Sequence, residues 1–88
     1  MTNHVNTVSA DTIRGLVVQA VGPELMNGVS DDEPLFEQHL LDSLSLVSIM
    51  TTFEQRLGIS VTPEDLVPAN FRTIIDMAQF VSAKLATR

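Results

Sequence analysis

Residues 43–57 read SLSLVSIMTTFEQRL and form the strongest helical pattern in the chain. The large apolar residues of this stretch follow an i, i+3, i+4, i+7, i+11 spacing, at Leu46, Ile49, Met50, Phe53 and Leu57. This spacing places them on one face of an α-helix, while the opposite positions are small or polar. The stretch therefore predicts an amphipathic helix that buries one stripe of side chains.

Capping residues flank this helix at both ends. Asp42 or Ser43 can cap its start, because both residue types accept a hydrogen bond from a first-turn amide. Gly58 follows its last apolar residue and suits the left-handed conformation that commonly ends a helix. We expect the helix to span residues 43–57.

A second helical pattern lies nearer the N-terminus, over residues 11–21. Ser9 or Asp11 can cap its start, and Gly22-Pro23 stops it. Its inner face is expected to consist of Ile13, Leu16, Val17, Ala20 and Val21.

Residues 22–42 are predicted to form a long loop, with a short helical turn near 23–27. At about 20 residues, the loop is longer than a compact domain normally carries without a purpose. It contains the acidic run Asp31-Asp32-Glu33, which we read as a solvated turn. Its apolar residues are expected to pin it across the helices; they are Leu25, Met26, Val29, Leu35, Phe36, Leu40 and Leu41.

The C-terminal third predicts one short helix and one long helix. Thr62 followed by Pro63 indicates a short helix over 63–67, which Pro68 would end. Thr73 then opens a last helix that runs to about Ala86. The prediction is an all-α four-helix bundle with three long helices and one short one, and a long loop between the first two. The domain would span 10–86, after a flexible tail at 1–9.

Composition excludes several classes of function. The chain has 88 residues, a net charge of −6 and no cysteine. Disulfides and cysteine-based metal sites are therefore excluded, and we expect no metal site. Nucleic acid and anionic lipid would repel an acidic surface. No apolar run approaches a bilayer span, and the N-terminus does not resemble a signal peptide. We expect a cytoplasmic monomer that neither inserts into membranes nor binds nucleic acid.

Ser43 is the residue with the clearest chemical potential. It lies where the long loop enters a long helix, so its hydroxyl is expected to be exposed. First-turn amides and the positive end of the helix dipole favour a phosphate ester at such a place. An Asp-Ser pair before a helix is, however, also a very common simple cap.

The surroundings of the Asp42-Ser43-Leu44 motif resemble the acyl carrier protein family, in its free-standing form. The resemblance covers roughly residues 11–86 and is carried by the joint order of several motifs. These are Phe36 upstream, Phe53 and Leu57-Gly58-Ile59 along and after the helix, Pro63-Glu64-Asp65-Leu66, and Phe71-Arg72-Thr73.

The resemblance implies a non-catalytic carrier whose Ser43 receives 4′-phosphopantetheine from coenzyme A through a phosphopantetheinyl transferase. The arm's thiol would hold an acyl or aminoacyl group as a thioester. An adenylating enzyme or acyl or aminoacyl ligase would load this cargo, and downstream enzymes of a biosynthetic pathway would use it. Asp42 would match the acidic residue that engages the transferase, and Leu44 the exposed apolar docking residue. Met50 and Thr51 would extend that docking surface.

Two departures from the family pattern point to a subtype. Leu40 and Leu41 stand where a glycine is common before the Asp-Ser pair, and His39 where some relatives have glycine. The helix over 43–57 carries only one acid, Glu54, where fatty-acid carriers usually have several. The chain is in both respects more similar to D-alanyl, aminoacyl or peptidyl carriers, and docking is expected to rest on apolar contacts.

Three other functions are open to the same residues. The chain could be an unmodified helical interaction module in which Ser43 is only a cap. The run Asp31-Asp32-Glu33 could indicate a calcium-binding regulatory protein, although it lacks the alternating ligands of a calcium loop. His39 could act as a base beside Ser43 in a hydrolase, but the chain is too short to enclose a substrate.

Overall fold

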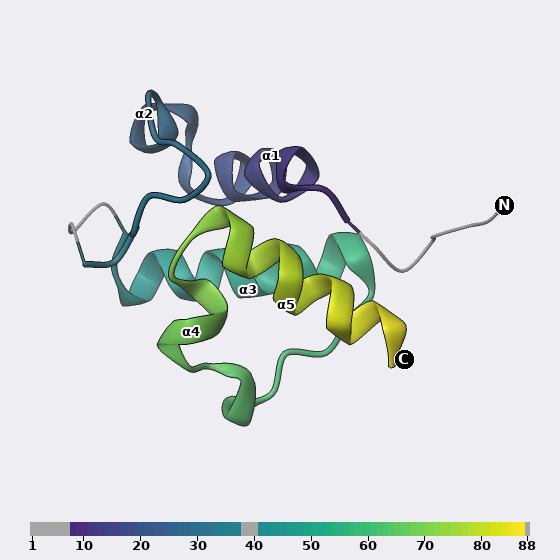
Figure 1. Cartoon of the computed structure of the whole chain (residues 1–88). Helices are drawn as coiled ribbons and strands as arrows, with labels where there is room; N and C mark the ends of the chain where they lie inside the picture. Colours follow the sequence, from purple (N-terminus) through teal and green to yellow (C-terminus); the bar gives the residue numbers. More distant parts are fainter. Residues whose placement is uncertain (1–7, 38–40, 88) are drawn as a thin grey trace, which may run out of the picture.

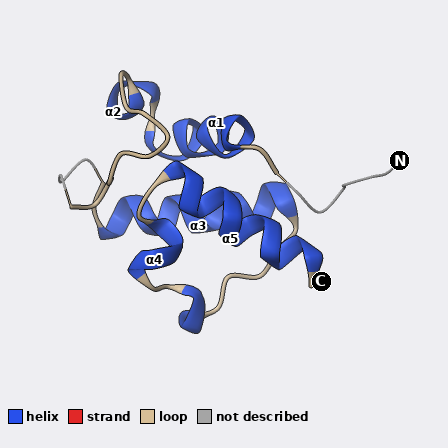
Figure 2. Ribbon diagram, in the orientation of Figure 1, coloured by secondary structure: helices blue, strands red, loops and turns tan. Residues whose placement is uncertain are grey.

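The computed structural model describes residues 8–37 and 41–87. These residues form helices joined by loops, with no strand among them (Figure 2). Three helices are long: α1 (Ala10–Val21), α3 (Ser43–Leu57) and α5 (Ile74–Ala86). Three are short: α2 (Pro23–Met26), the 3₁₀ helix η1 (Pro63–Asp65) and α4 (Pro68–Phe71). The prediction of an all-α chain with three long helices is confirmed, and α2 lies where a short helical turn was expected near 23–27. Between α3 and α5 there are two short helices where one was expected.

The long helices begin and end at the predicted capping residues. Ser9 Oγ accepts a hydrogen bond from the amide of Thr12 at the start of α1, at 3.1 Å. Thr73 Oγ1 does the same for the amide of Asp76 at the start of α5, at 3.0 Å. Gly58 ends α3 with φ of 69°, in the left-handed region that glycine enters without a steric penalty. Local sequence therefore sets these boundaries.

The segment between α3 and α5 differs from the prediction. Pro68 does not end a helix over 63–67, because η1 already ends at Asp65 and Pro68 is the first residue of α4. A proline is tolerated there because the first amides of a helix have no partner within it. The chain thus makes two short turns in different directions before it reaches α5 (Figure 1).

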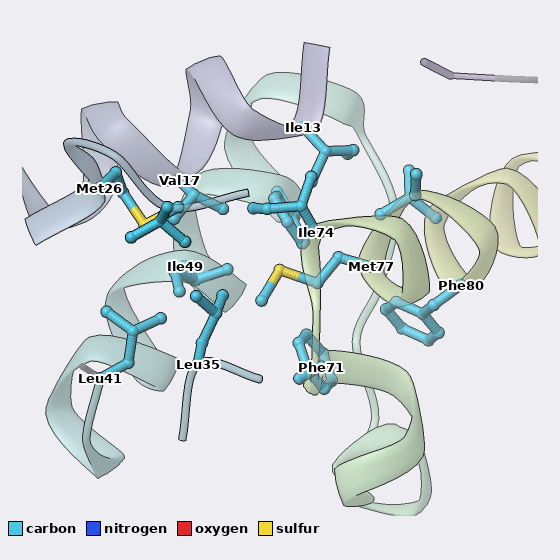
Figure 3. Packing of buried hydrophobic residues seen from close by; sticks show 14 of the residues in the cluster. Ile13, Val17, Met26, Leu35, Leu41, Ile49, Phe71, Ile74, Met77 and Phe80 are labelled. Atoms are coloured by element: carbon cyan, nitrogen blue, oxygen red, sulfur yellow. The ribbon is translucent and has the colours of Figure 1, made fainter. Parts of the chain in front are cut away.

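The core lies where α1 packs against both α3 and α5 (Figure 1). Figure 3 shows side chains from all three long helices meeting there with Phe71 of α4. The helix residues that are 0% exposed are Ile13, Val17, Ile49, Phe53, Ile74, Met77 and Val81. On α3 this means that Ile49 and Phe53 form the centre of the predicted stripe. Leu46, Met50 and Leu57 lie half-buried at its edges.

The long loop is fastened to the helices, as predicted, by part of its apolar side chains. Met26, Val29, Leu35 and Leu41 are buried in the core cluster. Figure 3 shows Met26, Leu35 and Leu41 among the core side chains. Leu25 does not contribute in this way, because it lies on the one-turn helix α2 and is 42% exposed. The loop is therefore anchored to the core at several points, and the last of them, Leu41, directly precedes the N-cap of α3.

Polar contacts add to this attachment. The guanidinium of Arg14 in α1 pairs with Asp31 at 2.7 Å, and the carbonyl of Asp31 accepts the amide of Ile75 in α5 at 3.1 Å. Ser30 hydrogen-bonds to both Asp32 and Glu33. The acidic run forms a turn, as predicted, and Asp32 is exposed, while Asp31 is in addition bonded to α1 and α5. In the described part of the chain, no helix is both long enough and apolar enough to cross a membrane.

Candidate functional site

Ser43 is the first residue of α3, and its side chain is exposed. Asp42 precedes it as the N-cap, with extended backbone angles. The carboxylate of Asp42 accepts the amide of Ser45 at 2.9 Å, and its carbonyl accepts the amide of Leu46 at 2.9 Å. Of the two residues that could cap α3, Asp42 does so, and the hydroxyl of Ser43 remains outside this cap.

The cap also determines the charge beside Ser43. The amide of Ser45, followed by its hydroxyl, hydrogen-bonds to the carboxylate and holds the pKa of Asp42 below its ordinary value. Asp42 is therefore ionised at neutral pH. A carboxylate with a lowered pKa is a weak base, so Asp42 is poorly suited to removing the proton of Ser43.

Leu44 is the most exposed large apolar residue described, at 79%. An apolar residue at this position could instead pack under the loop, against Phe36 or Leu40. Such exposure excludes close packing against Phe36, while Leu40 and His39 lie outside the described residues. Leu44 is therefore a solvent-exposed apolar side chain directly after Ser43 in the sequence.

Val47 extends this apolar surface, and the sequence reasoning did not single it out. It is 52% exposed and lies about 40° around the helix from Ser43 and about 60° from Leu44. Thr51, one turn further, is exposed, whereas Met50 is half-buried at the border of the core stripe. The signal was present, because Val47, like Leu44, is apolar but off the 46-49-50-53-57 stripe. We call Leu44, Val47 and Thr51 the outward face of α3.

The single acid of α3 is engaged in the fold. Glu54 Oε2 accepts the amide of Val61 at 2.9 Å and so ties the end of α3 to the segment that follows it. The outward face therefore presents no carboxylate of its own beyond Asp42 at its start. Association through this face would depend mainly on apolar contact, since charge pairing needs a charge at the contact.

A small apolar pocket opens beside the first turn of α3. Its volume is about 200 Å³, and Leu46 of α3 forms one wall. Residues 66–68, 71 and 72, from the end of η1 through α4, also line it, and Glu37 and Arg72, which form an ion pair, are both among the lining residues. The apolar lining residues besides Leu46 are Phe36, Leu66, Val67, Pro68 and Phe71.

Known proteins share this sequence pattern. A family model described as "Phosphopantetheine attachment site" matches residues 11–81, which include the whole of α1 beyond its first residue, all of α3 and Ser43. One curated relative is described as "Probable acyl carrier protein PigG" of Serratia sp. (strain ATCC 39006) and is 29% identical over 55 residues. That alignment covers 62% of this chain and 63% of the relative, which is less than two thirds of the relative's length.

Proposed function

The chain belongs to the phosphopantetheine attachment site family, whose members carry a covalently attached 4′-phosphopantetheine group, and we propose that it is a carrier protein modified on Ser43. The observation that carries the proposal is the position of Ser43. Its hydroxyl is exposed at the first residue of α3, inside the matched region and outside the Asp42 cap. Phosphate groups are stabilised at such helix starts by first-turn amides and by the helix dipole.

The residues of the chain fit this group chemically. Ser43 Oγ would attack the phosphorus of the coenzyme A pyrophosphate, forming a phosphodiester while the bond to the nucleotide part breaks. The hydroxyl proton would pass to a base of the transferase, because the lowered pKa of Asp42 makes its carboxylate a weak base. When bound, the group supplies a thiol that forms thioesters, which the chain itself cannot do because it has no cysteine. The protein is then a substrate and a carrier, and the chemistry belongs to its partners.

The outward face of α3 is the proposed docking surface for the transferase and for a loading ligase or adenylating enzyme. Leu44 and Val47 provide its apolar centre, Thr51 completes it, and Asp42 and Met50 border it. Because Glu54 is engaged with Val61, this face has little negative charge to offer a basic partner. That property supports a carrier of amino acids or peptidyl groups over a fatty-acid carrier.

Intact mass spectrometry tests the attachment site. Co-expression with a broad-specificity phosphopantetheinyl transferase should add one phosphopantetheine group to the wild-type chain and none to Ser43→Ala. Ser48→Ala is the matched control, since Ser48 is an exposed serine on the same helix, and it should be modified like the wild type. Modification of Ser43→Ala would refute the site. No modification of the wild type by several transferases would favour an unmodified interaction module instead.

A further inference from the structure

Residue 72 holds the segment before Ser43 through two separate bonds. The carbonyl of Arg72, which follows α4, accepts the amide of Leu35 at 2.9 Å. The guanidinium Nε of the same residue donates to Glu37 Oε2, also at 2.9 Å. One residue thus attaches positions 35 and 37 of the loop to the turn between α4 and α5.

The attachment continues to the start of α3. The carbonyl of Leu35 accepts the amide of Leu41 at 3.2 Å, and both leucines are buried in the core. Asp42 follows immediately and caps the helix through Ser45. A chain of contacts therefore runs from Arg72 through Leu35 and Leu41 to the residue next to Ser43.

The ion pair between Arg72 and Glu37 is expected to affect the nearby loop residues more than the stability of the whole fold. Its side chains are 49% exposed for Arg72 and 62% for Glu37, so solvent screens the pair and it contributes little to the stability of the fold. Both residues of the pair line the apolar pocket that Leu46 of α3 also lines. Losing the pair should leave the fold intact and loosen residues 35–37.

We propose that Arg72 is a positioning residue for the modification of Ser43, because it holds the flanking positions 35–37 and 41–42 in the arrangement that the transferase binds. This inference rests on the proposed function. If the pair is lost, the carrier spends less time in the binding-competent arrangement. The apparent affinity of the transferase for the carrier falls in proportion to the fraction of carrier molecules in that arrangement. Turnover of the bound carrier stays the same.

Transferase kinetics with carrier variants test the proposal. Arg72→Gln removes the charge but keeps the carbonyl that accepts Leu35. We expect the KM for the carrier to rise about two- to five-fold with kcat unchanged, in line with an exposed ion pair. Glu37→Gln should raise the KM to a similar extent. The double variant should have a KM no higher than either single variant, because both changes remove the same ion pair. Arg72→Lys keeps the positive charge and should have a KM close to that of the wild type.

Lys84→Gln is the matched control. Lys84 pairs with Asp65 at 2.6 Å and joins α5 to η1, so the variant loses an ion pair that does not contact the segment before Ser43. Its KM should equal that of the wild type.

Amide hydrogen exchange gives a readout that is independent of any enzyme. In Arg72→Gln, exchange at Leu35 and Leu41 should accelerate about two- to five-fold. Exchange at Met77 in α5, whose amide donates to the carbonyl of the N-cap residue Thr73, should not change. An unchanged KM together with unchanged exchange in Arg72→Gln would overturn the inference, as would an equal rise in KM for Lys84→Gln. Failure of the wild type to be modified would instead overturn the proposed function, so the two failures are distinguishable.

Discussion

The two faces of α3 both carry large apolar residues, but those of one face are buried and those of the other are exposed. On the inner face, Ile49 and Phe53 are 0% exposed in the core, whereas on the outward face Leu44 is 79% and Val47 52% exposed. Burying an apolar side chain stabilises a protein by roughly 1.5–3 kcal/mol, and the outward residues obtain no comparable gain within this chain. The difference shows that apolar character alone does not make a residue part of the core. It also supports the proposal that the outward face is a docking surface.

The largest expected effect comes from the inner face. Phe53→Ala should destabilise the domain by about 3–5 kcal/mol, because truncation of a fully buried aromatic residue leaves a cavity. A small domain has little more stability than this, so a large fraction of the protein should be unfolded. Thermal or urea denaturation followed by circular dichroism measures the effect. A melting temperature close to that of the wild type would show that Phe53 is not at the centre of the core.

The outward face should show the reverse behaviour. Leu44→Glu and Val47→Glu should keep the wild-type melting temperature but slow modification and loading about ten- to a hundredfold, as expected when a leucine-sized contact is lost. Ser48→Glu adds the same charge to an exposed polar position beside this face and serves as the control. If Ser48→Glu impairs loading equally, added charge explains the effect and apolar docking does not.

Salt dependence separates apolar from electrostatic docking on the same surface. Raising the ionic strength from low to physiological values should change the wild-type loading rate less than Leu44→Glu does, because salt screens charges and not apolar contact. Loading rates across a salt series provide the measurement. A steep salt dependence with an unaffected Leu44→Glu would move the contact to acids elsewhere, such as Asp32 and Glu33.

A smaller effect on the melting temperature is expected at Asp42, the N-cap of α3. Asp42→Ala should lower the melting temperature by about 4–8 °C, because it removes the N-cap of α3. Ser43→Ala should change it by less than that, since the hydroxyl of Ser43 is not part of the cap. Thermal melts of the two variants decide the point, and equal losses would mean that Ser43 takes part in capping.

The smallest effect concerns pH and Asp42. Its pKa is lowered in the folded state by the amide and then the hydroxyl of Ser45, so its stabilising contribution is present above the unfolded value of about 3.9. That contribution is lost as the pH falls through the lower folded pKa. Asp42→Asn keeps a capping oxygen but does not titrate. Between pH 6 and about pH 3, its melting temperature should fall less than that of the wild type; a parallel fall would assign the acid sensitivity to other carboxylates, such as Asp65.

Local sequence determined the long helices and their ends. The stripe on α3, the caps at Ser9 and Thr73, and the stop at Gly58 all depend on bonds or contacts within about one helical turn. The exposed hydroxyl of Ser43 was predictable for the same reason, because a residue at the start of a helix projects from its end. These features need no knowledge of distant parts of the chain.

Tertiary structure decided the features that depend on distant partners. Arg72 bonds to Leu35 and Glu37 across more than 30 residues, and Arg14 reaches Asp31 from another element. The exposure of Val47 follows from the absence of a covering segment over that side of α3 in the described residues, and periodicity shows only that the residue is off the stripe. Even the engagement of Glu54 depends on where the chain places Val61. A sequence pattern records which side chains share a face, whereas packing of remote segments determines whether that face is covered.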